Sequence, residues 1–211
     1  MDERAIGRDS LVSAHIYLEG GATGADSNED KIRCRQGFRK LLENCGFAGR
    51  LPRLTPCGSR NDTFQSFRSG LEMRKSSFVA MWVDSEDPVL NVEESWTHLK
   101  SRDNWDRPAG ATDEQVLLMT TCMETLIAAD RNTLLKHYGS RLQVSALPPL
   151  EHLEQRHRHD VQDRLVHATR DCSNQYAKGK RSFDVVGKLN PDALEQMPSF
   201  KRTRRILEAK L

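Results

Sequence analysis

The chain has 211 residues, a length that suits one domain or one domain with a helical appendage. Its hydrophobic fraction of 37%, charged fraction of 29% and net charge of +2 are typical of a polar-surfaced globular protein, and so small a charge does not by itself indicate nucleic-acid binding. No apolar stretch approaches the ~18 residues of a membrane span, and the first residues lack the apolar segment of a secretion signal. Five scattered cysteines without a CxxC pair are typical of a reducing compartment, so we expect a cytoplasmic protein without a disulfide framework or zinc site.

The N-terminal part of the chain predicts a strand, a helix and a second strand. Residues 11–18 alternate apolar and polar positions, as a strand does, and a loop rich in Gly, Asp and Ser follows. Residues 29–46 then carry apolar side chains at helical spacing and end at a glycine. Residues 50–58 indicate a short or edge strand, because two prolines remove backbone donors.

The next segment predicts a helix followed by a buried strand. Residues 61–75 have helical spacing, with Asn61 or Asp62 as the expected N-cap. Residues 78–83 are continuously apolar, which favours a strand that is covered on both faces. Strands alternating with helices are typical of a parallel sheet with helices on both sides, so we expect an α/β fold.

The rest of the chain is polar at first and then mainly helical. Residues 91–114 form a polar excursion whose two tryptophans either pack over the sheet or stack on an unpaired base. Residues 115–139 begin as a strand or a helix and end as a helix, and the later pattern is helical with a break at 173–180. We therefore predict an α/β domain over 11–140 and a helical C-terminal extension over 141–211 that packs on it.

Carboxylates follow two of the predicted strands. Glu19 ends the first strand, and Asp84 and Glu86 end the strand at 78–83. Ligands of parallel sheets sit beyond the carboxyl ends of the strands, so the three acids would meet in one crevice if both strands share a sheet. Their repulsion calls for a cation, and oxygen ligands favour Mg²⁺ or Mn²⁺, a combination suited to phosphodiester hydrolysis. Acids at strand ends can also be solvated or cap a turn, and that alternative stays open for each of them.

Several blocks of the sequence resemble a known family. The Glu-Gly of "LEGG" and the Asp-x-Glu of "VDSED" resemble the Toprim signature of topoisomerases, primases, ribosomal-RNA maturases and overcoming-lysogenization-defect nucleases. The blocks "PCGSRNDTFQSF", "HLKSRDNWDRP", "LMTTCMETLIAADR" and "YAKGKRSF" further resemble a small bacterial Toprim-like family catalogued as domain of unknown function 4276. That resemblance spans residues 12 to about 190. It implies a Toprim-like fold and a metal-dependent nuclease that acts beside an ABC-type ATPase in phage defence.

The resemblance also implies roles for individual residues. Glu19 matches the Toprim glutamate, a metal ligand or general acid/base, and Asp84 and Glu86 match the metal-binding Asp-x-Asp. The second acid is a glutamate here, one methylene longer, so Asp87 is an alternative ligand. Asp26 lies where many Toprim loops have another acid. Glu124 matches a recurring family acid and is the fourth candidate ligand, although a carboxylate in the first turn of a helix can simply favour the helix dipole.

Glycines and basic residues complete the candidate site. Gly20 and Gly21 would let a substrate backbone approach, although they match neither a dinucleotide-binding nor a Walker motif. Arg35, Lys178 and Lys180 would contact phosphate, or else be solvated. Spacing excludes His152, His157 and His159 from one zinc-binding helix face, so we expect surface histidines.

Three functions remain open on the sequence alone. The first is a Mg²⁺- or Mn²⁺-dependent nuclease with RNA or DNA as substrate. The second is a non-catalytic Toprim-like binding or regulatory module, which the Asp-x-Glu departure and the near-neutral charge favour. The third is a phosphatase of a small substrate, because such enzymes use similar carboxylates on similar sheets. The chain is too short for the strand passage or priming of the large Toprim enzymes.

Overall fold

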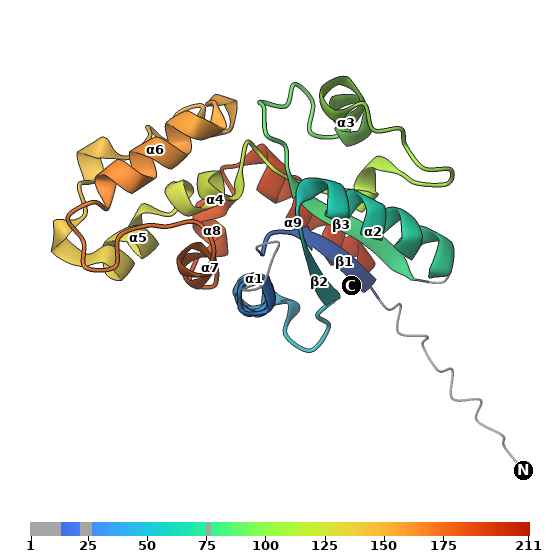
Figure 1. The fold of residues 1–211 in the computed structure, drawn as a ribbon, viewed down its shortest axis with the longest axis horizontal. Coiled ribbons are helices and arrows are strands. Elements are labelled where there is room, and N and C mark those ends of the chain that lie inside the picture. The colour runs from blue at the N-terminus through green and yellow to red at the C-terminus, as the bar shows by residue number, and fades with distance from the viewer. Residues whose placement is uncertain (1–13, 22–26, 75–76) are drawn as a thin grey trace, which may run out of the picture.

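The computed structural model of the protein describes residues 14–21, 27–74 and 77–211, without the side chains of Ser27 and Lys180. Within these residues the fold is mixed α/β, with a four-stranded sheet flanked by helices and a helical C-terminal region (Figure 1). All strands are parallel, and their order is β2-β1-β3-β4. The strands are β1 Ala14–Glu19, β2 Arg53–Gly58, β3 Phe78–Asp84 and β4 Val116–Met119.

The helices at 27–42 and 60–73 lie where the sequence predicts helices, whereas the predicted polar excursion at 91–114 contains a helix at 95–103 that the sequence did not indicate. Between and after the strands lie α1 Ser27–Leu42, α2 Arg60–Met73 and α3 Ser95–Asp103, then α4 Met123–Ala129, α5 Arg131–Tyr138, α6 Arg158–Ala168, α7 Lys180–Val186, α8 Pro191–Leu194 and α9 Pro198–Lys210. The α/β prediction is confirmed, as is the strand at 78–83. The segment 115–139, left open between strand and helix, begins as β4 and continues as α4 and α5.

Two details of the predicted elements differ from the structure or are refined by it. The N-cap of α2 is Ser59 and not Asn61 or Asp62: the helix begins at Arg60, two residues earlier than an Asn61 cap implies, and the Asp62 N–H donates to Ser59 Oγ at 3.1 Å. The segment with two prolines forms β2 at the sheet edge; Pro52 precedes the strand, and Pro56 within it is on a strand whose one neighbour in the sheet is β1. Residues 11–13 of the first predicted strand lie outside the described residues.

The sheet is covered on both faces, which explains the apolar runs of its central strands. On one face, Tyr17, Met81 and Val83 pack with Phe64 and Phe67 of α2 and with the α3 region. The opposite face packs against α1, α9 and the C-terminal helices; there the Phe38 and Trp82 rings meet edge to face, 4.9 Å between centroids. Successive strand residues alternate between the two faces of the sheet. When both faces are covered, every side chain of the strand is buried, and apolar residues are favoured at each position.

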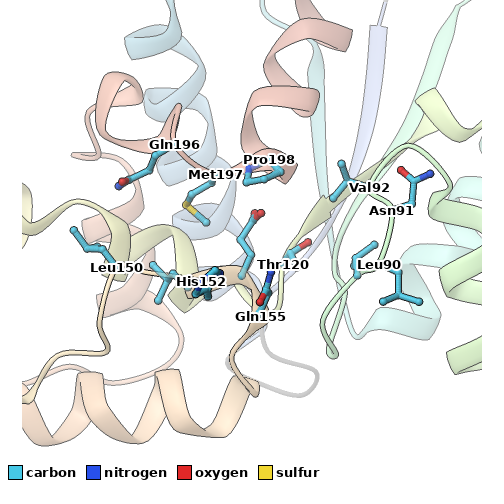
Figure 2. Close-up of a pocket in the computed structure, with 13 residues that line it drawn as sticks. Leu90, Asn91, Val92, Thr120, Leu150, His152, Gln155, Gln196, Met197 and Pro198 are labelled. Carbon is cyan, nitrogen blue, oxygen red and sulfur yellow. The ribbon is translucent and has the colours of Figure 1, made fainter.

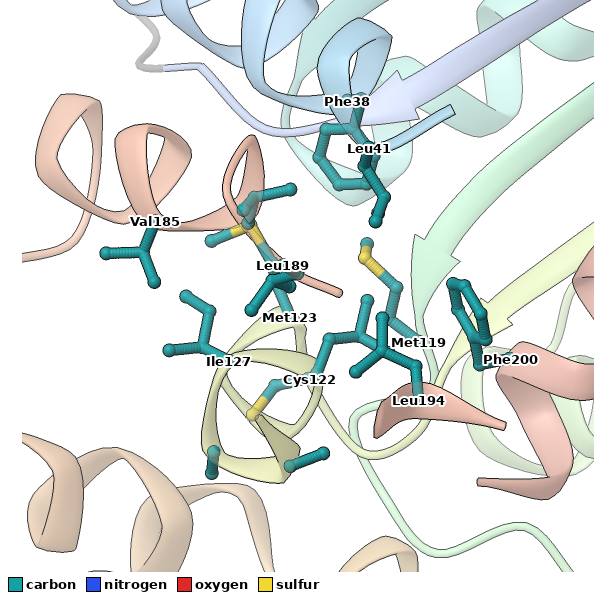
Figure 3. Close-up of a cluster of buried hydrophobic side chains, with 14 of the residues drawn as sticks. Phe38, Leu41, Met119, Cys122, Met123, Ile127, Val185, Leu189, Leu194 and Phe200 are labelled. Carbon is teal, nitrogen blue, oxygen red and sulfur yellow. The ribbon is translucent and has the colours of Figure 1, made fainter. Parts of the chain in front are cut away.

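One hydrophobic cluster joins the sheet to the C-terminal helices. Figure 3 shows Phe38 and Leu41 of α1 near Met119 at the end of β4, with Ile127, Val185 and Leu189 beside them. The cluster contains residues from both sides of the predicted boundary at residue 140, and α4 to α8 extend from one end of the sheet (Figure 1). The division into two domains stays a prediction. In the described ranges no helix combines the length and apolar character needed to cross a bilayer.

The two tryptophans of the polar excursion pack within the protein. Trp96 is buried, and its Nε1–H donates to the Thr112 carbonyl at 3.0 Å. Trp105 lies between the Phe64 ring, stacked at 4.3 Å between centroids, and the Arg60 guanidinium, 4.9 Å from its ring. The packing alternative is therefore confirmed, since both faces of Trp105 are already in contact.

The order in which strands are added across the sheet reverses between β1 and β3, which makes this position the topological switch point. From β1 the chain passes through α1 to β2 on one side, and it later returns to form β3 on the other side of β1. Because α1 follows β1 and α3 follows β3, and these two helices cover opposite faces of the sheet, the loops after β1 and β3 diverge and leave a crevice at the carboxyl ends of these strands. Glu19 and Asp84, the last residues of β1 and β3, are located there.

His15, near the start of β1, gives a prediction about stability. Burial, followed by the charges of Arg74 and Arg53, lowers the pKa of His15 to about 4, and His15 Nε2 lies 2.9 Å from Thr55 Oγ1. The unfolded chain protonates this ring near its ordinary pKa of about 6.5, so stability that depends on neutral His15 is lost as the pH falls from about 6.5 to 4. We expect the difference in free energy of unfolding, wild type minus His15→Gln, to decrease as the pH falls through this interval. Urea titrations at several pH values measure it.

The control for this experiment is His167→Gln, because His167 is an exposed histidine on α6. Its difference from wild type should stay constant across the same interval. A difference between wild type and His15→Gln that does not change with pH would contradict the assignment.

Candidate functional site

Glu19 and Asp84 are in direct contact at the carboxyl ends of neighbouring strands. The backbone N–H of Asp84 donates to Glu19 Oε2 at 3.0 Å. Arg60, the first residue of α2, lies with Nη1 at 3.7 Å from the same Glu19 oxygen and donates to the Asp84 carbonyl. The first turn of α2 therefore supplies the cation that ties the two strand ends together.

Asp84 carries a charge that the protein leaves poorly compensated. Its Oδ1 is buried, and no hydrogen-bond donor in the described part of the chain reaches it. Burial, and then the charges of Glu19 and Glu124, raise the pKa of Asp84 well above its ordinary value. Burial likewise raises the pKa of Glu19, partly offset by Arg60. A carboxyl group in this environment keeps its proton to a higher pH than an ordinary aspartate does, unless a nearby cation stabilises its ionised form.

Glu86 is held close to this pair by an unusual backbone and by two arginines. Its φ of 69° is in the left-handed region, and its N–H donates to the Thr121 carbonyl at 2.7 Å. Carboxylate oxygens of Glu19, Asp84 and Glu86 lie within 4.8 Å of one another. Arg102 Nη2 contacts Glu86 Oε2 at 3.3 Å, and Arg158 contacts the same oxygen. Glu86 is therefore paired with both arginines and also offers one carboxylate oxygen to the cluster with Glu19 and Asp84.

The arginines themselves are fixed by further acids. Arg60 donates to both carboxylate oxygens of Asp103, at 3.2 Å and 2.6 Å. Arg102 contacts Asp103 and also Asp87, the latter at 3.1 Å. Asp87, the alternative ligand, is therefore paired with Arg102 in this structure. The result is a chain of alternating charges that runs from β1 to α3.

A cleft of about 350 Å³ opens beside Glu19 and Asp84 and receives Glu124. Glu124 is buried at the start of α4, where Oε1 accepts from the Tyr176 hydroxyl at 2.6 Å and Oε2 from Gln162 Nε2 at 3.2 Å. Lys178 Nζ lies 4.0 Å from Glu124 Oε1. Glu124 thus faces the same cleft as the strand-end acids but has partners of its own, and its role as a fourth ligand stays a prediction.

Gly20 and Gly21 line this cleft, and packing requires both of them. They have φ values of 132° and 86°, which side chains other than glycine rarely adopt. A Cβ at Gly20 would lie 3.1 Å from Cys34 Sγ, and one at Gly21 would lie 2.8 Å from Lys31 Cγ. Close packing by the protein itself therefore accounts for both glycines, and approach of a substrate backbone stays a prediction.

The structure brings some predicted residues together and separates others. Glu19, Gly20, Gly21, Asp84, Glu124 and Lys178 line the cleft, and Glu86 adjoins it. Arg35 is exposed on α1 and is not part of the lining. Asp26 and the Lys180 side chain lie outside the described residues. The three candidate histidines are exposed, as expected.

A second cavity, of about 440 Å³, has a different character (Figure 2). It lies between the segment around Leu90 and the start of α9, and its lining includes His152 and Met197. Its one carboxylate, Glu154, accepts from the Ser199 N–H at 3.2 Å and so caps α9. Glu154 therefore has a structural partner, whereas several acids, among them Glu19, Asp84 and Glu124, line the smaller cleft.

The strand-end site fits a divalent cation. The acids that take part are more numerous than their basic partners: Glu19, Asp84, Glu86, Asp87, Asp103 and Glu124 against Arg60, Arg102, Arg158 and Lys178. A cation among Glu19, Asp84 and Glu86 would reduce this imbalance and give the buried Asp84 Oδ1 a partner. Carboxylate oxygens are the ligands that Mg²⁺ and Mn²⁺ prefer.

Sequence reasoning missed four residues of the site. Arg60, Arg102 and Tyr176 lie within the family-like blocks, but the resemblance implied no role for them, and Arg158 lies outside those blocks; each reaches the acids only through the tertiary fold. A weak local signal exists for Arg60, which follows directly on the N-cap serine after β2 and so must lie at the carboxyl edge of the sheet. No comparable local signal places the side chains of Arg158 or Tyr176 near the acids.

Fold and site together define an α/β protein with a carboxylate cluster at the switch point of a parallel sheet. Residues 26–208 match the family described as Domain of unknown function (DUF4276), and the chain belongs to this family. Comparison with curated proteins and comparison with solved structures each find no match.

The crowding of negative charge predicts that Asp84→Asn stabilises the metal-free protein. The substitution removes a charge that burial, Glu19 and Glu124 all disfavour. We expect Tm to rise by about 2–4 °C, which corresponds to roughly 1 kcal/mol for a chain of this size. The gain should shrink as the pH falls, because the raised pKa of Asp84 lets the folded wild type take up the proton first. Thermal unfolding in chelator measures both effects.

Asp106→Asn is the control, because Asp106 is an exposed aspartate whose ion-pair partner among the described residues is Lys100. This variant has the same change in charge and should leave Tm almost unchanged. A lower Tm for Asp84→Asn than for Asp106→Asn would show that the Asp84 charge is compensated within the protein.

Proposed function

We propose that the protein is a divalent-metal-dependent phosphodiester hydrolase, a nuclease of the Toprim type, with Glu19, Asp84 and Glu86 around Mg²⁺ or Mn²⁺. One observation carries the proposal: Asp84 Oδ1 is buried without a donor among described residues, and Glu19 and Glu86 offer oxygens within 4.8 Å of its carboxylate. Apolar packing could have filled this position at far lower cost, since an uncompensated buried charge destabilises a fold.

In this proposal the residues of the site have different roles in hydrolysis. A bound divalent ion would lower the pKa of water and stabilise negative charge on phosphate oxygens. Glu19 and Asp84 would hold the ion, and Glu86 would add a carboxylate oxygen while it remains paired with the arginines. Lys178 is exposed at the cleft and would contact a phosphate oxygen beside Glu124. Without the ion, the negative charges of the acids would repel an anionic substrate.

The substrate class in this proposal is RNA or DNA, and the family resemblance extends it to a role with an ABC-type ATPase in phage defence. Two rivals make different demands on the same residues. A binding or regulatory module would not need the buried Asp84 charge, and a phosphatase would accept a mononucleotide. Measurements of metal binding and of the preferred substrate length therefore distinguish these two rivals from the proposed nuclease.

The proposal predicts metal-dependent cleavage that is lost in Glu19→Gln and in Asp84→Asn. Wild type should cut a mixture of RNA and DNA with Mn²⁺ or Mg²⁺, and calorimetry should detect Mn²⁺ binding. Both substitutions remove a negatively charged ligand, so each should weaken Mn²⁺ binding at least about tenfold. Mn²⁺ at a hundredfold over its Kd should stabilise wild type by about 2.7 kcal/mol, a shift that thermal unfolding detects.

Glu154→Gln is the matched control, because Glu154 is a partly buried carboxylate in the other cavity. It should leave Mn²⁺ binding and cleavage intact. Absence of Mn²⁺ binding by wild type would contradict the proposed metal site and favour the binding or regulatory module. Cleavage of mononucleotides in preference to polymers would favour the phosphatase.

A further inference from the structure

Arg158 stands apart from the other arginines of the site. Arg102 is held by three carboxylates and Arg60 by the Asp103 carboxylate and the Asp84 carbonyl. In the described ranges, the only acid that Arg158 contacts is Glu86, and the only other polar contact is from its Nε–H to His159 Nε2, at 3.3 Å. Its side chain is 30% exposed. Arg158 therefore has guanidinium N–H groups to offer that the structure does not already use.

The position of Arg158 complements that of Lys178. Lys178 lies beside Glu124 in the cleft, whereas Arg158 lies beside Glu86, which adjoins the cleft without lining it. The two cations thus contact different acids of the site, Lys178 inside the cleft and Arg158 outside its lining. A strand with several phosphates can contact two such separate cations, whereas one phosphate at the metal has less use for both.

Geometry and residue type also suit Arg158 to phosphate. A guanidinium can donate two parallel N–H groups to phosphate oxygens, which a lysine cannot do. Arg158 comes from α6 in the C-terminal helical region, and its neighbour Arg156 is held through its partners in the same segment, including Asp160 at 3.6 Å. Glu86 Oε2 fixes the guanidinium next to the carboxylate cluster.

We propose that Arg158 binds a backbone phosphate of a polynucleotide beside Glu86, at a position separate from that of Lys178 in the cleft. Glu86 positions this arginine through Oε2. The inference rests on the proposed function and names its substrate as a nucleic-acid strand that extends past the site on both sides. The alternative is that Arg158 only neutralises Glu86.

Salt-dependent binding separates the two roles. The probe is a fluorescently labelled single-stranded oligonucleotide, with Ca²⁺ in place of Mg²⁺ to slow cleavage, and anisotropy gives Kd at several salt concentrations. Arg158→Gln should weaken binding at least about tenfold, since a charge-assisted contact is lost. It should also reduce the slope of log K against log salt by about 0.7, the value for one phosphate contact on a single strand. Arg158→Lys should keep the slope and recover only part of the affinity.

Arg164→Gln is the matched control, because Arg164 lies on the same helix and pairs with Asp160 at 2.7 Å. It should change neither the affinity nor the slope. Calorimetry with Mn²⁺ should show that Arg158→Gln still binds the metal, which establishes that the site remains folded.

Three outcomes would overturn the inference in distinguishable ways. An unchanged salt slope in Arg158→Gln assigns Arg158 to neutralisation of Glu86 and leaves the proposed function standing. Equal affinity of wild type for a nucleoside monophosphate and for the oligonucleotide overturns the polynucleotide substrate. Failure of wild type to bind either Mn²⁺ or oligonucleotide overturns the proposed function and the inference together.

Discussion

The repulsion among carboxylates at the carboxyl ends of β1 and β3 is the constraint on which the rest of the site depends. Glu19 and Asp84 meet there because the two strands are neighbours, and the Asp84 N–H donates to Glu19 at 3.0 Å. Like charges this close raise one another's pKa, and burial adds to the effect. The basic residues around them come from the first turn of α2, from α3, from the start of α6 and from the loop before α7. Four separate segments thus converge to balance one cluster.

This convergence gives the C-terminal region a role beyond packing. Its helices join the hydrophobic cluster that covers one face of the sheet, and Phe183 of α7 packs against the Gly20 turn. The same region supplies Arg158 to Glu86 and Tyr176 to Glu124. Apolar burial stabilises the arrangement, and the polar side chains that it positions complete the site. Loss of the C-terminal helices would therefore remove both part of the core and half of the charge balance.

Glu86 links the arginines to the carboxylate cluster. Its backbone is left-handed at φ 69°, and its carboxylate contacts both Arg102 and Arg158. One of its oxygens also lies within 4.8 Å of oxygens of Glu19 and Asp84. The length of a glutamate side chain helps it to reach both the arginines and the other acids from this backbone position.

The sequence by itself determined the α/β class, the buried strand at 78–83 and the placement of Glu19 and Asp84 at strand ends, because apolar periodicity and turn residues are local signals. Only the tertiary structure decided that β1 and β3 are adjacent, that Ser59 caps α2, that Arg35 does not line the cleft, and that Arg60, Arg158 and Tyr176 reach the acids. Those contacts join residues as far apart as Glu86 and Arg158, and they arise from the packing of whole elements. No local pattern encodes such a distance.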